Sequence, residues 1–118
     1  MKRLFAFTLL ELLIVIVVVG ILAGIGVVAY LNAIEQARAA EAWTVLSNII
    51  NAEKRYYLEY NSYTSTLTNL DIEVPTSSNF TFSFSNPWAI ANRVSAEGGR
   101  KSYRLNLNGT KESINGTY

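Results

Sequence analysis

An apolar run from Leu9 to Leu31 constrains this chain more than any other feature of its sequence, and it contains a single charged residue, Glu11. As an α-helix rising about 1.5 Å per residue, the run would measure roughly 35 Å, enough to cross a hydrocarbon core of about 30 Å. A carboxylate inside such a span costs roughly 2.5 to 3.5 kcal/mol on insertion scales and usually marks a functional pairing. Because residues 7–35 contain no Lys, Arg or His, the cation that pairs with Glu11 must be created or supplied by another chain.

The residues around Glu11 suggest what that cation is. A short basic leader is followed by Phe-Thr-Leu-Leu-Glu at residues 7–11 and then by the long apolar segment. This arrangement resembles the amino-terminal signature of type IV pilins and type II secretion pseudopilins. The resemblance implies that a prepilin peptidase cleaves between Ala6 and Phe7 and that the new Phe7 amine is methylated. It also implies that Glu11 docks against the Phe7 amine of a neighbouring subunit. The family usually has Gly at the position of Ala6.

Two other interpretations of the apolar run remain open. A secretory signal peptide also begins with basic residues, and Val27-Val28-Ala29 offers a small-residue cleavage site, but the run is longer than a typical signal-peptide core. A plain single-span membrane anchor fits the length. It leaves Glu11 without an explanation.

The composition limits the classes of function that the chain can serve. Its 118 residues allow one small domain in addition to a membrane span. The absence of Cys and His excludes a Cys or His zinc cage, a haem His ligand, disulfides and the common Ser-His and Cys-His nucleophile pairs. We therefore expect no catalytic residue, no metal site and no cofactor, and the chain is not predicted to be an enzyme.

The distribution of charge predicts the orientation in the membrane. Lys2 and Arg3 precede the span, whereas Glu35 and Arg38 are the first charges after it. By the positive-inside rule, the chain would be a single-pass inner-membrane protein with a cytoplasmic amino terminus. Removing residues 1–6 takes two of the ten basic residues, leaving eight against nine acidic ones, so nucleic acid is not an expected partner.

The helix is predicted to continue beyond the membrane span, from Phe7 to about Tyr60. Apolar residues recur at helical spacing after Leu31, with polar residues between them, so the second half is amphipathic. This divides the chain into a leader (1–6), a transmembrane or filament-core half of the helix (7–31), an amphipathic half (32–60), and a head of loop and sheet (61–118).

The head is predicted to be an antiparallel sheet. Apolar and polar residues alternate in residues 80–85 and 102–107, residues 88–94 add a further strand, and Asn108-Gly109 indicates a two-residue hairpin leading into residues 110–114. The predicted fold class is α+β, a type IV pilin-like ladle whose long helix packs on the sheet. The helix residues expected to contact the sheet are Trp43, Leu46, Ile50 and Tyr57.

Three glycines, Gly20, Gly24 and Gly26, interrupt the apolar half of the helix. Each costs on the order of 1 kcal/mol relative to Ala in a helix interior. They predict either a segment that unwinds when the subunit enters a filament or a site of close helix packing. The family commonly has a Pro where this chain has Val28, so any unwinding depends on glycine alone.

The carboxy-terminal part of the chain is locally basic. A DNA-uptake or adhesive surface is one interpretation and a solvated surface is the simpler one. The basic residues are Arg93, Arg100, Lys101, Arg104 and Lys111.

The sequence is thus interpreted as a structural subunit of an extracellular type IV pilus-like filament. Its expected partners are identical or homologous subunits, the prepilin peptidase, the inner-membrane assembly machinery and, before assembly, the membrane. A pseudopilin of type II secretion and a DNA-binding minor pilin are the alternatives. The major pseudopilins commonly hold calcium near the carboxy terminus, where this chain offers only Glu97 and Glu112 after Ser85.

Overall fold

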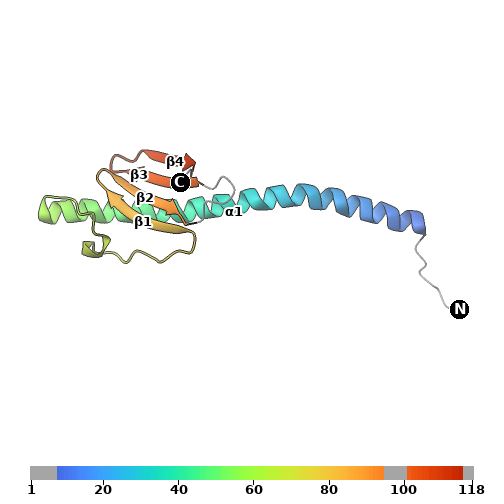
Figure 1. Ribbon diagram of the computed structural model, residues 1–118, viewed down its shortest axis with the longest axis horizontal. Helices are drawn as coiled ribbons and strands as arrows, with labels where there is room; N and C mark the ends of the chain where they lie inside the picture. The colour runs from blue at the N-terminus through green and yellow to red at the C-terminus, as the bar shows by residue number, and fades with distance from the viewer. Residues whose placement is uncertain (1–7, 95–100, 116–118) are drawn as a thin grey trace. The chain divides into compact units, whose positions relative to one another are not determined.

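The computed structural model describes residues 8–94 and 101–115, and the chain divides into two units, residues 1–36 and residues 37–118. Its long amino-terminal helix packs on an antiparallel sheet, so the predicted α+β class is confirmed. The helix ends where the sequence predicts; its predicted start at Phe7 lies outside the described residues. In chain order the elements are α1 (Leu9–Tyr60), the short 3-10 helix η1 (Leu67–Asn69), β1 (Phe80–Ser85), β2 (Trp88–Arg93), β3 (Lys101–Asn106) and β4 (Lys111–Asn115) (Figure 1).

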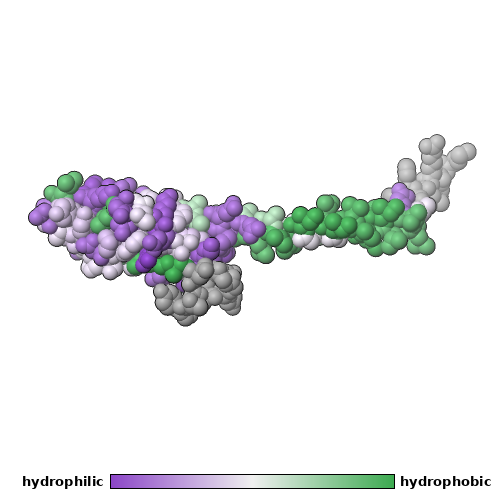
Figure 2. Space-filling model, turned by 90° about the horizontal axis from the view of Figure 1, so that it is seen from above, coloured by the Kyte–Doolittle hydropathy of each residue, from purple (hydrophilic) through white to green (hydrophobic). Residues whose placement is uncertain are grey.

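In the first unit, α1 carries a continuous apolar surface (Figure 2). The large apolar side chains from Leu9 to Leu31 are 48% to 87% exposed. By length and composition, α1 is long and apolar enough to cross a membrane. Within the described chain, nothing covers this surface, so it must be covered by hydrocarbon or by other proteins.

In the second unit, four strands form a sheet in the order β1-β2-β3-β4, with every neighbouring pair antiparallel (Figure 1). The strands lie within about one residue of their predicted positions. The β1–β2 register pairs Phe84 with Ala89, and the β2–β3 register pairs Ala91 with Tyr103. The apolar partners therefore lie on one face of the sheet.

That face packs on the second half of α1. Side chains three or four positions apart on the helix are buried, among them Ala42, Leu46 and Ile49 at 0% exposure. Opposite them, Ala89 and Ala91 of the central strand β2 are small enough to let the helix approach closely. The buried apolar core is Ala42, Val45, Leu46, Ile49, Ile50, Ala52, Leu70, Phe80, Phe84, Ala89, Ala91, Tyr103 and Leu105.

The β3–β4 hairpin differs from the predicted two-residue turn. The N–H of Asn106 donates to the carbonyl of Thr110 (2.9 Å), and Gly109 N–H donates to the carbonyl of Asn106 (2.9 Å), so three residues form the loop. Gly109 has a φ of +93°, whereas Asn108 does not have the positive φ that a type I′ turn requires. Side chains explain the longer loop, since Asn106 Oδ1 accepts from Asn108 N–H (3.1 Å) and Asn108 Oδ1 accepts from Thr110 N–H (2.9 Å).

The loop between α1 and β1 returns along the helix and is held there by two carboxylates. Arg55 on α1 donates to both oxygens of Asp71, each at 2.8 Å. Ser77 Oγ donates to Glu41 Oε1 at 2.8 Å. The Arg55–Asp71 pair is exposed, so it fixes the geometry of the loop more than it stabilises the head.

A third carboxylate, Glu53, lies wholly inside the head at 0% exposure. Its Oε2 accepts a hydrogen bond from Thr64 N–H (3.0 Å), while Oε1 has no partner among the described residues. Burial raises the pKa of Glu53, and the Thr64 hydrogen bond opposes that rise. Periodicity and composition do not distinguish this buried carboxylate, because a Glu at this position resembles the exposed polar residues beside it.

Glu53→Gln should therefore change how stability depends on pH. The folded state holds the Glu53 proton more tightly than the unfolded state does. The resulting stabilisation of the folded state is fully present below a pH of about 4.5 and is lost as pH rises through the raised pKa. Gln keeps an acceptor for Thr64 without a titrating group. The free energy of unfolding of Glu53→Gln, minus that of the wild type, should rise between pH 4 and pH 7.

Urea titrations of the full-length chain in detergent micelles, followed by the fluorescence of Trp43 and Trp88, measure this difference. The lowered pKa of Asp71, caused by Arg55, acts in the opposite direction but cancels in the comparison. Asn48→Gln, at an exposed position of the same helix and without a titrating group, is the control and should give a flat difference. Parallel pH profiles for wild type and Glu53→Gln would contradict the prediction.

Candidate subunit-docking site

The described chain begins with a helix cap at Thr8. Its Oγ1 accepts the backbone N–H of Glu11 (3.1 Å), and its carbonyl accepts that of Leu12 (3.1 Å). Thr8 is thus the N-cap of α1, and a Thr followed three residues later by Glu is the spacing of a capping box. This capping-box spacing in residues 8–11 is a local signal that locates the helix start from the sequence alone.

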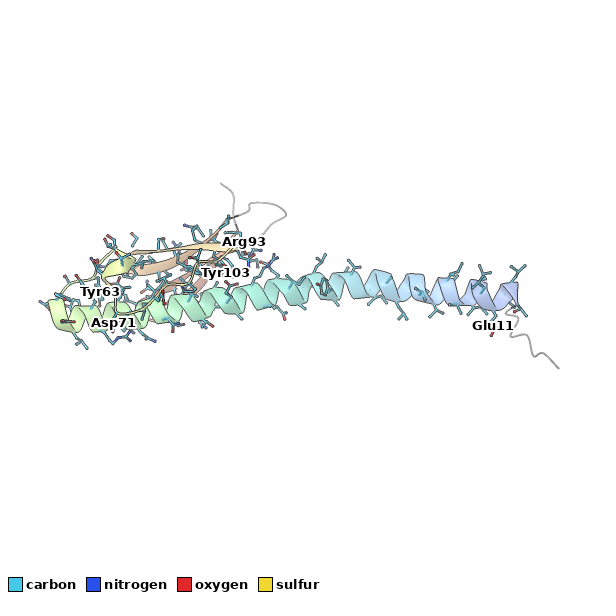
Figure 3. The ribbon with its side chains drawn as sticks, turned by 90° about the horizontal axis from the view of Figure 1, so that it is seen from below. Glu11, Tyr63, Asp71, Arg93 and Tyr103 are labelled. Atoms are coloured by element: carbon cyan, nitrogen blue, oxygen red, sulfur yellow. The ribbon has the colours of Figure 1, made fainter. Side chains whose placement is uncertain are left out.

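The cap leaves the Glu11 carboxylate available. The bond to Thr8 uses the backbone of Glu11, and among the described residues its side-chain oxygens make no hydrogen bond or ion pair. Glu11 is exposed in the first turn of α1 (Figure 3), where the positive end of the helix dipole favours a negative charge by about 0.3–1 kcal/mol. A carboxylate so placed is able to bind a cation from outside the chain. The expected partner, the Phe7 amine, and the expected cleavage position at Ala6 lie outside the described residues.

The three glycines lie within unbroken helix. An added Cβ at Gly20, Gly24 or Gly26 would meet no atom within 4 Å. Neither the backbone nor the packing of one chain therefore requires glycine at these positions. Both interpretations of the glycines, unwinding in a filament and close helix packing, involve neighbouring chains, so the structure of one chain does not distinguish them.

The four residues expected to join the helix to the sheet occupy different environments. Leu46 and Ile50 are buried in the core. Trp43 is half-buried and meets Tyr103 edge to face at 5.2 Å between ring centroids. Tyr57 is 40% exposed and stacks on Tyr63 of the returning loop at 4.7 Å between ring centroids.

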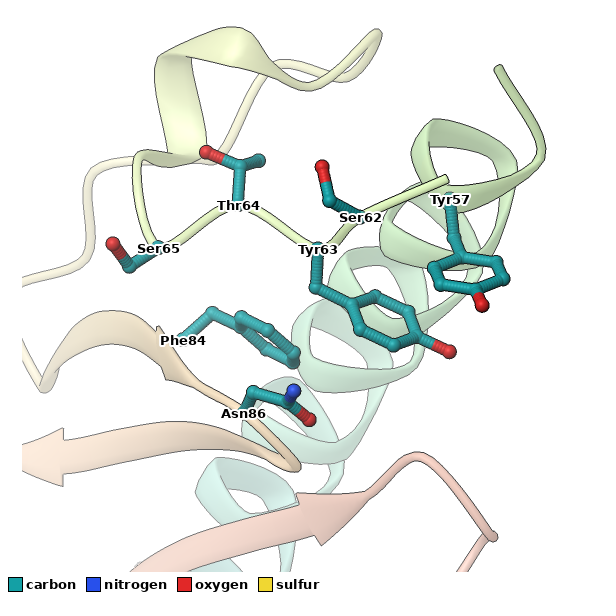
Figure 4. A pocket seen from close by; sticks show the side chains of 7 residues that line it. All are labelled: Tyr57, Ser62, Tyr63, Thr64, Ser65, Phe84 and Asn86. Atoms are coloured by element: carbon teal, nitrogen blue, oxygen red, sulfur yellow. The ribbon is translucent and has the colours of Figure 1, made fainter. Parts of the chain in front are cut away.

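Tyr57 and Tyr63 stand beside an open hollow between the end of α1, the start of the loop and the end of β1 (Figure 4). The lining mixes aromatic rings with hydroxyl and amide groups and contains no charged residue. The residues that line it are Tyr57, Ser62, Tyr63, Thr64, Ser65, Phe84 and Asn86.

Three of the five basic residues near the carboxy terminus are engaged within the head. Arg104 donates to Glu112 (Nε to Oε2, 2.7 Å) and lies 4.3 Å from the centroid of the Trp88 ring. Arg93 lies 5.0 Å from the Phe80 ring and Lys111 5.3 Å from the Trp43 ring, each to the centroid. Lys101 is exposed, and Arg100 lies outside the described residues. In the part of the chain that the structure describes, no group of three or more acidic residues could hold a metal ion.

Comparison with known proteins agrees with the resemblance seen at the amino terminus. The family model described as the prokaryotic N-terminal methylation motif matches residues 1–27. Two proteins of Neisseria gonorrhoeae, each named "Type IV major pilin protein PilE1", are 35% identical to the chain over 71 residues. This region is 60% of the chain and 43% and 39% of the two relatives, so the chain spans less than half the length of either.

The motif and these relatives show that the chain is similar to type IV pilins over its amino-terminal part. The arrangement of one long amino-terminal helix on a four-stranded antiparallel sheet is pilin-like. The relatives are structural pilins, a family not known to be enzymatic.

Replacing Gly20, Gly24 and Gly26 together by Ala should stiffen the apolar half of the helix. The open space around each position predicts a well-folded membrane form, with about 1 kcal/mol of added helix stability per position and slower amide exchange in residues 18–28. In wild-type filaments we expect the backbone hydrogen bonding to loosen between residues 20 and 28, and a filament map decides this. Ala23→Gly, in the same stretch, is the control that adds a glycine. A map with unbroken helices in close contact at all three glycines would reject unwinding and support packing.

Proposed function

We propose that this protein is a structural subunit of an extracellular type IV pilus-like filament. A prepilin peptidase removes residues 1–6, the Phe7 amine is methylated, and the mature subunit waits in the inner membrane with its amino terminus toward the cytoplasm. The assembly machinery in that membrane then moves it into a filament of identical or homologous subunits. In the filament, Glu11 of one subunit pairs with the Phe7 amine of its neighbour.

The observation that carries the proposal is the exposed apolar half of α1. It begins with a capped first turn in which the Glu11 carboxylate has no partner among the described residues. One surface suits two environments, because lipid before assembly and packed helices after it are both apolar. A charge within a helix bundle is costly unless it is paired, so Glu11 favours the bundle in which a cation is supplied. The methylation motif and the pilin relatives support the same sequence of events.

The proposal gives each segment a separate role. Residues 7–31 are the membrane span and later the filament core, residues 32–60 carry the head, and residues 61–118 form its loop and sheet. A type II secretion pseudopilin would share residues 7–31, and the names of the two relatives favour a pilus over that alternative. A DNA-binding minor pilin would need its basic side chains available, and Arg104 is already neutralised by Glu112.

Processing provides the direct test. Surface filaments sheared from cells and examined by electron microscopy should contain this chain, and mass spectrometry of its amino-terminal peptide should begin at Phe7 with one methyl group. Cleavage at that position creates the Phe7 amine that, in this proposal, pairs with Glu11 of the neighbouring subunit. An amino terminus at Met1 would favour a plain anchor, and one near Tyr30 would favour a secreted domain.

Substitutions of Glu11 test the docking charge. The cap bond uses the backbone of residue 11, so changing the side chain leaves the Thr8 cap in place. Glu11→Gln should permit membrane insertion and cleavage but reduce the share of subunits in filaments, because the amine loses its partner. Glu11→Lys should abolish assembly by placing two cations together. Immunoblots of the membrane and filament fractions measure the two pools.

Thr8→Val is the matched control, because it removes the cap acceptor and keeps the carboxylate. It should cost about 1 kcal/mol of helix stability and leave assembly much closer to that of the wild type than Glu11→Gln does. If Glu11→Lys subunits enter filaments as well as the wild type, Glu11 is not the docking charge.

A further inference from the structure

The second unit carries unpaired charges of opposite sign on its two flanks. On one flank, Lys54 of α1 and Lys111 of β4 line a hollow of about 300 Å³ beside the β3–β4 hairpin. Both side chains are exposed, and among the described residues neither forms an ion pair. No carboxylate lines the hollow, and apolar Ile50, Leu105 and Leu107 contribute to its wall. The flank therefore suits an anionic group attached to an apolar surface.

The other flank is acidic. Glu59 of α1 lies beside the loop where Arg55 and Asp71 already neutralise one another, and Glu73 lies next to Ile72 on the same loop. Glu59 and Glu73 are both exposed, and within the described chain neither has an ion-pair partner. Two separate hollows along the loop, one lined by Glu59 and the other by Glu73, thus carry the acidic charge of this flank.

The two flanks lie at opposite edges of the sheet. The basic flank adjoins β4, which is one edge strand, and the acidic flank belongs to the loop that leads into β1, the other edge strand. Figure 1 shows β4 and this loop on opposite sides of α1. One chain therefore does not bring its two flanks together, but two chains side by side do. Two different, complementary patches make a head-to-tail contact, which repeats indefinitely when the rotation between subunits does not close a ring.

We propose that the Lys54–Lys111 flank of each subunit docks against the Glu59–Glu73 flank of the next copy of this chain. The inference rests on the proposed function, since a filament is what brings copies side by side. Exposed ion pairs contribute little affinity individually, so this contact acts mainly by fixing the lateral register of the heads and by disfavouring registers that juxtapose like charges. The apolar half of α1 then supplies the attraction, and the head charges select the alignment.

Charge reversal with rescue tests the contact in cells that assemble wild-type filaments. Lys54→Glu with Lys111→Glu should lower the filament fraction severalfold, and so should Glu59→Lys with Glu73→Lys. The chain that carries all four changes should recover most of the wild-type yield, because the complementarity is restored with its sign reversed. Among the described residues, none of the four side chains forms a hydrogen bond or an ion pair, and only Lys111 gives up a contact, the one with the Trp43 ring. The membrane pools of full-length subunit should therefore stay equal.

Crosslinking supplies a second measurement, which the absence of cysteine makes simple. Subunits with Lys54→Cys and subunits with Glu73→Cys are expressed together, and a bifunctional maleimide is added, because a lysine–glutamate contact is too wide for a disulfide. Filaments should yield a mixed dimer. The matched control pairs Lys54→Cys subunits with Lys111→Cys subunits, two positions on one flank, and should yield far less.

Each outcome decides between defined alternatives. If wild-type cells make no filaments, the proposed function fails and the contact fails with it. If filaments form but the fourfold variant assembles no better than the double variants, or the mixed dimer does not exceed the control, only the contact is overturned. If Lys54→Glu with Lys111→Glu leaves filament yield unchanged but abolishes salt-sensitive binding of a DNA probe, the basic flank serves nucleic acid and the contact is again overturned.

Discussion

The constraint on which the rest of the structure depends is that every backbone N–H and C=O in an apolar environment must find a partner within the chain. An α-helix meets this requirement segment by segment, so residues 9–31 stay helical in lipid. The large apolar side chains of these residues, in contrast, are 48% or more exposed, and nothing in the described chain covers them. The first unit therefore requires contact with lipid or with other protein chains.

In the proposed filament, Glu11 restricts which contacts the apolar surface makes, because its carboxylate needs a cation. The N-cap at Thr8 satisfies a backbone donor at the helix start, and the positive end of the helix helps to hold a negative charge there. These two effects make the carboxylate tolerable near a membrane interface. Inside a helix bundle they are too small to offset the loss of water, which is worth several kcal/mol for an unpaired ion. A carboxylate that is acceptable in one environment and needs a cation in the other favours assembly with subunits that supply one.

The sheet of the head packs on the second half of the same helix. A stripe of buried side chains from Ala42 to Glu53 packs on the inner face of the sheet, and the returning loop is fastened to the helix through Glu53, Arg55 and Glu41. The polar contacts position the loop, while the apolar core supplies most of the stability, at roughly 25 cal/mol per Å² buried. One consequence is that charges not used in fastening, such as Lys54 and Glu59, remain on the surface as potential contacts with other subunits.

The sequence by itself determined the features that depend on local periodicity and composition. The helix through Tyr60, the alternation in β1 and β3, the absence of cysteine chemistry and the unusual charge at Glu11 were all readable from residues close together in the chain. Thr8 could also have been recognised, since the spacing of a capping box is local.

Only the tertiary structure decided which side chains the fold buries or pairs. Glu53 became a buried acid because the loop at Thr64 covers it, and Tyr57 remained 40% exposed because it meets a ring of the loop and lies outside the core. The hairpin loop became one residue longer than its Asn-Gly pair suggested, because side-chain hydrogen bonds from Asn106 and Asn108 stabilise it. The environments of Glu53 and Tyr57 depend on contacts with residues distant in sequence, which spacing along the chain does not encode because packing of the loop on the helix creates them. The hairpin loop depends on competing hydrogen bonds within one turn, which an Asn-Gly pair alone does not specify.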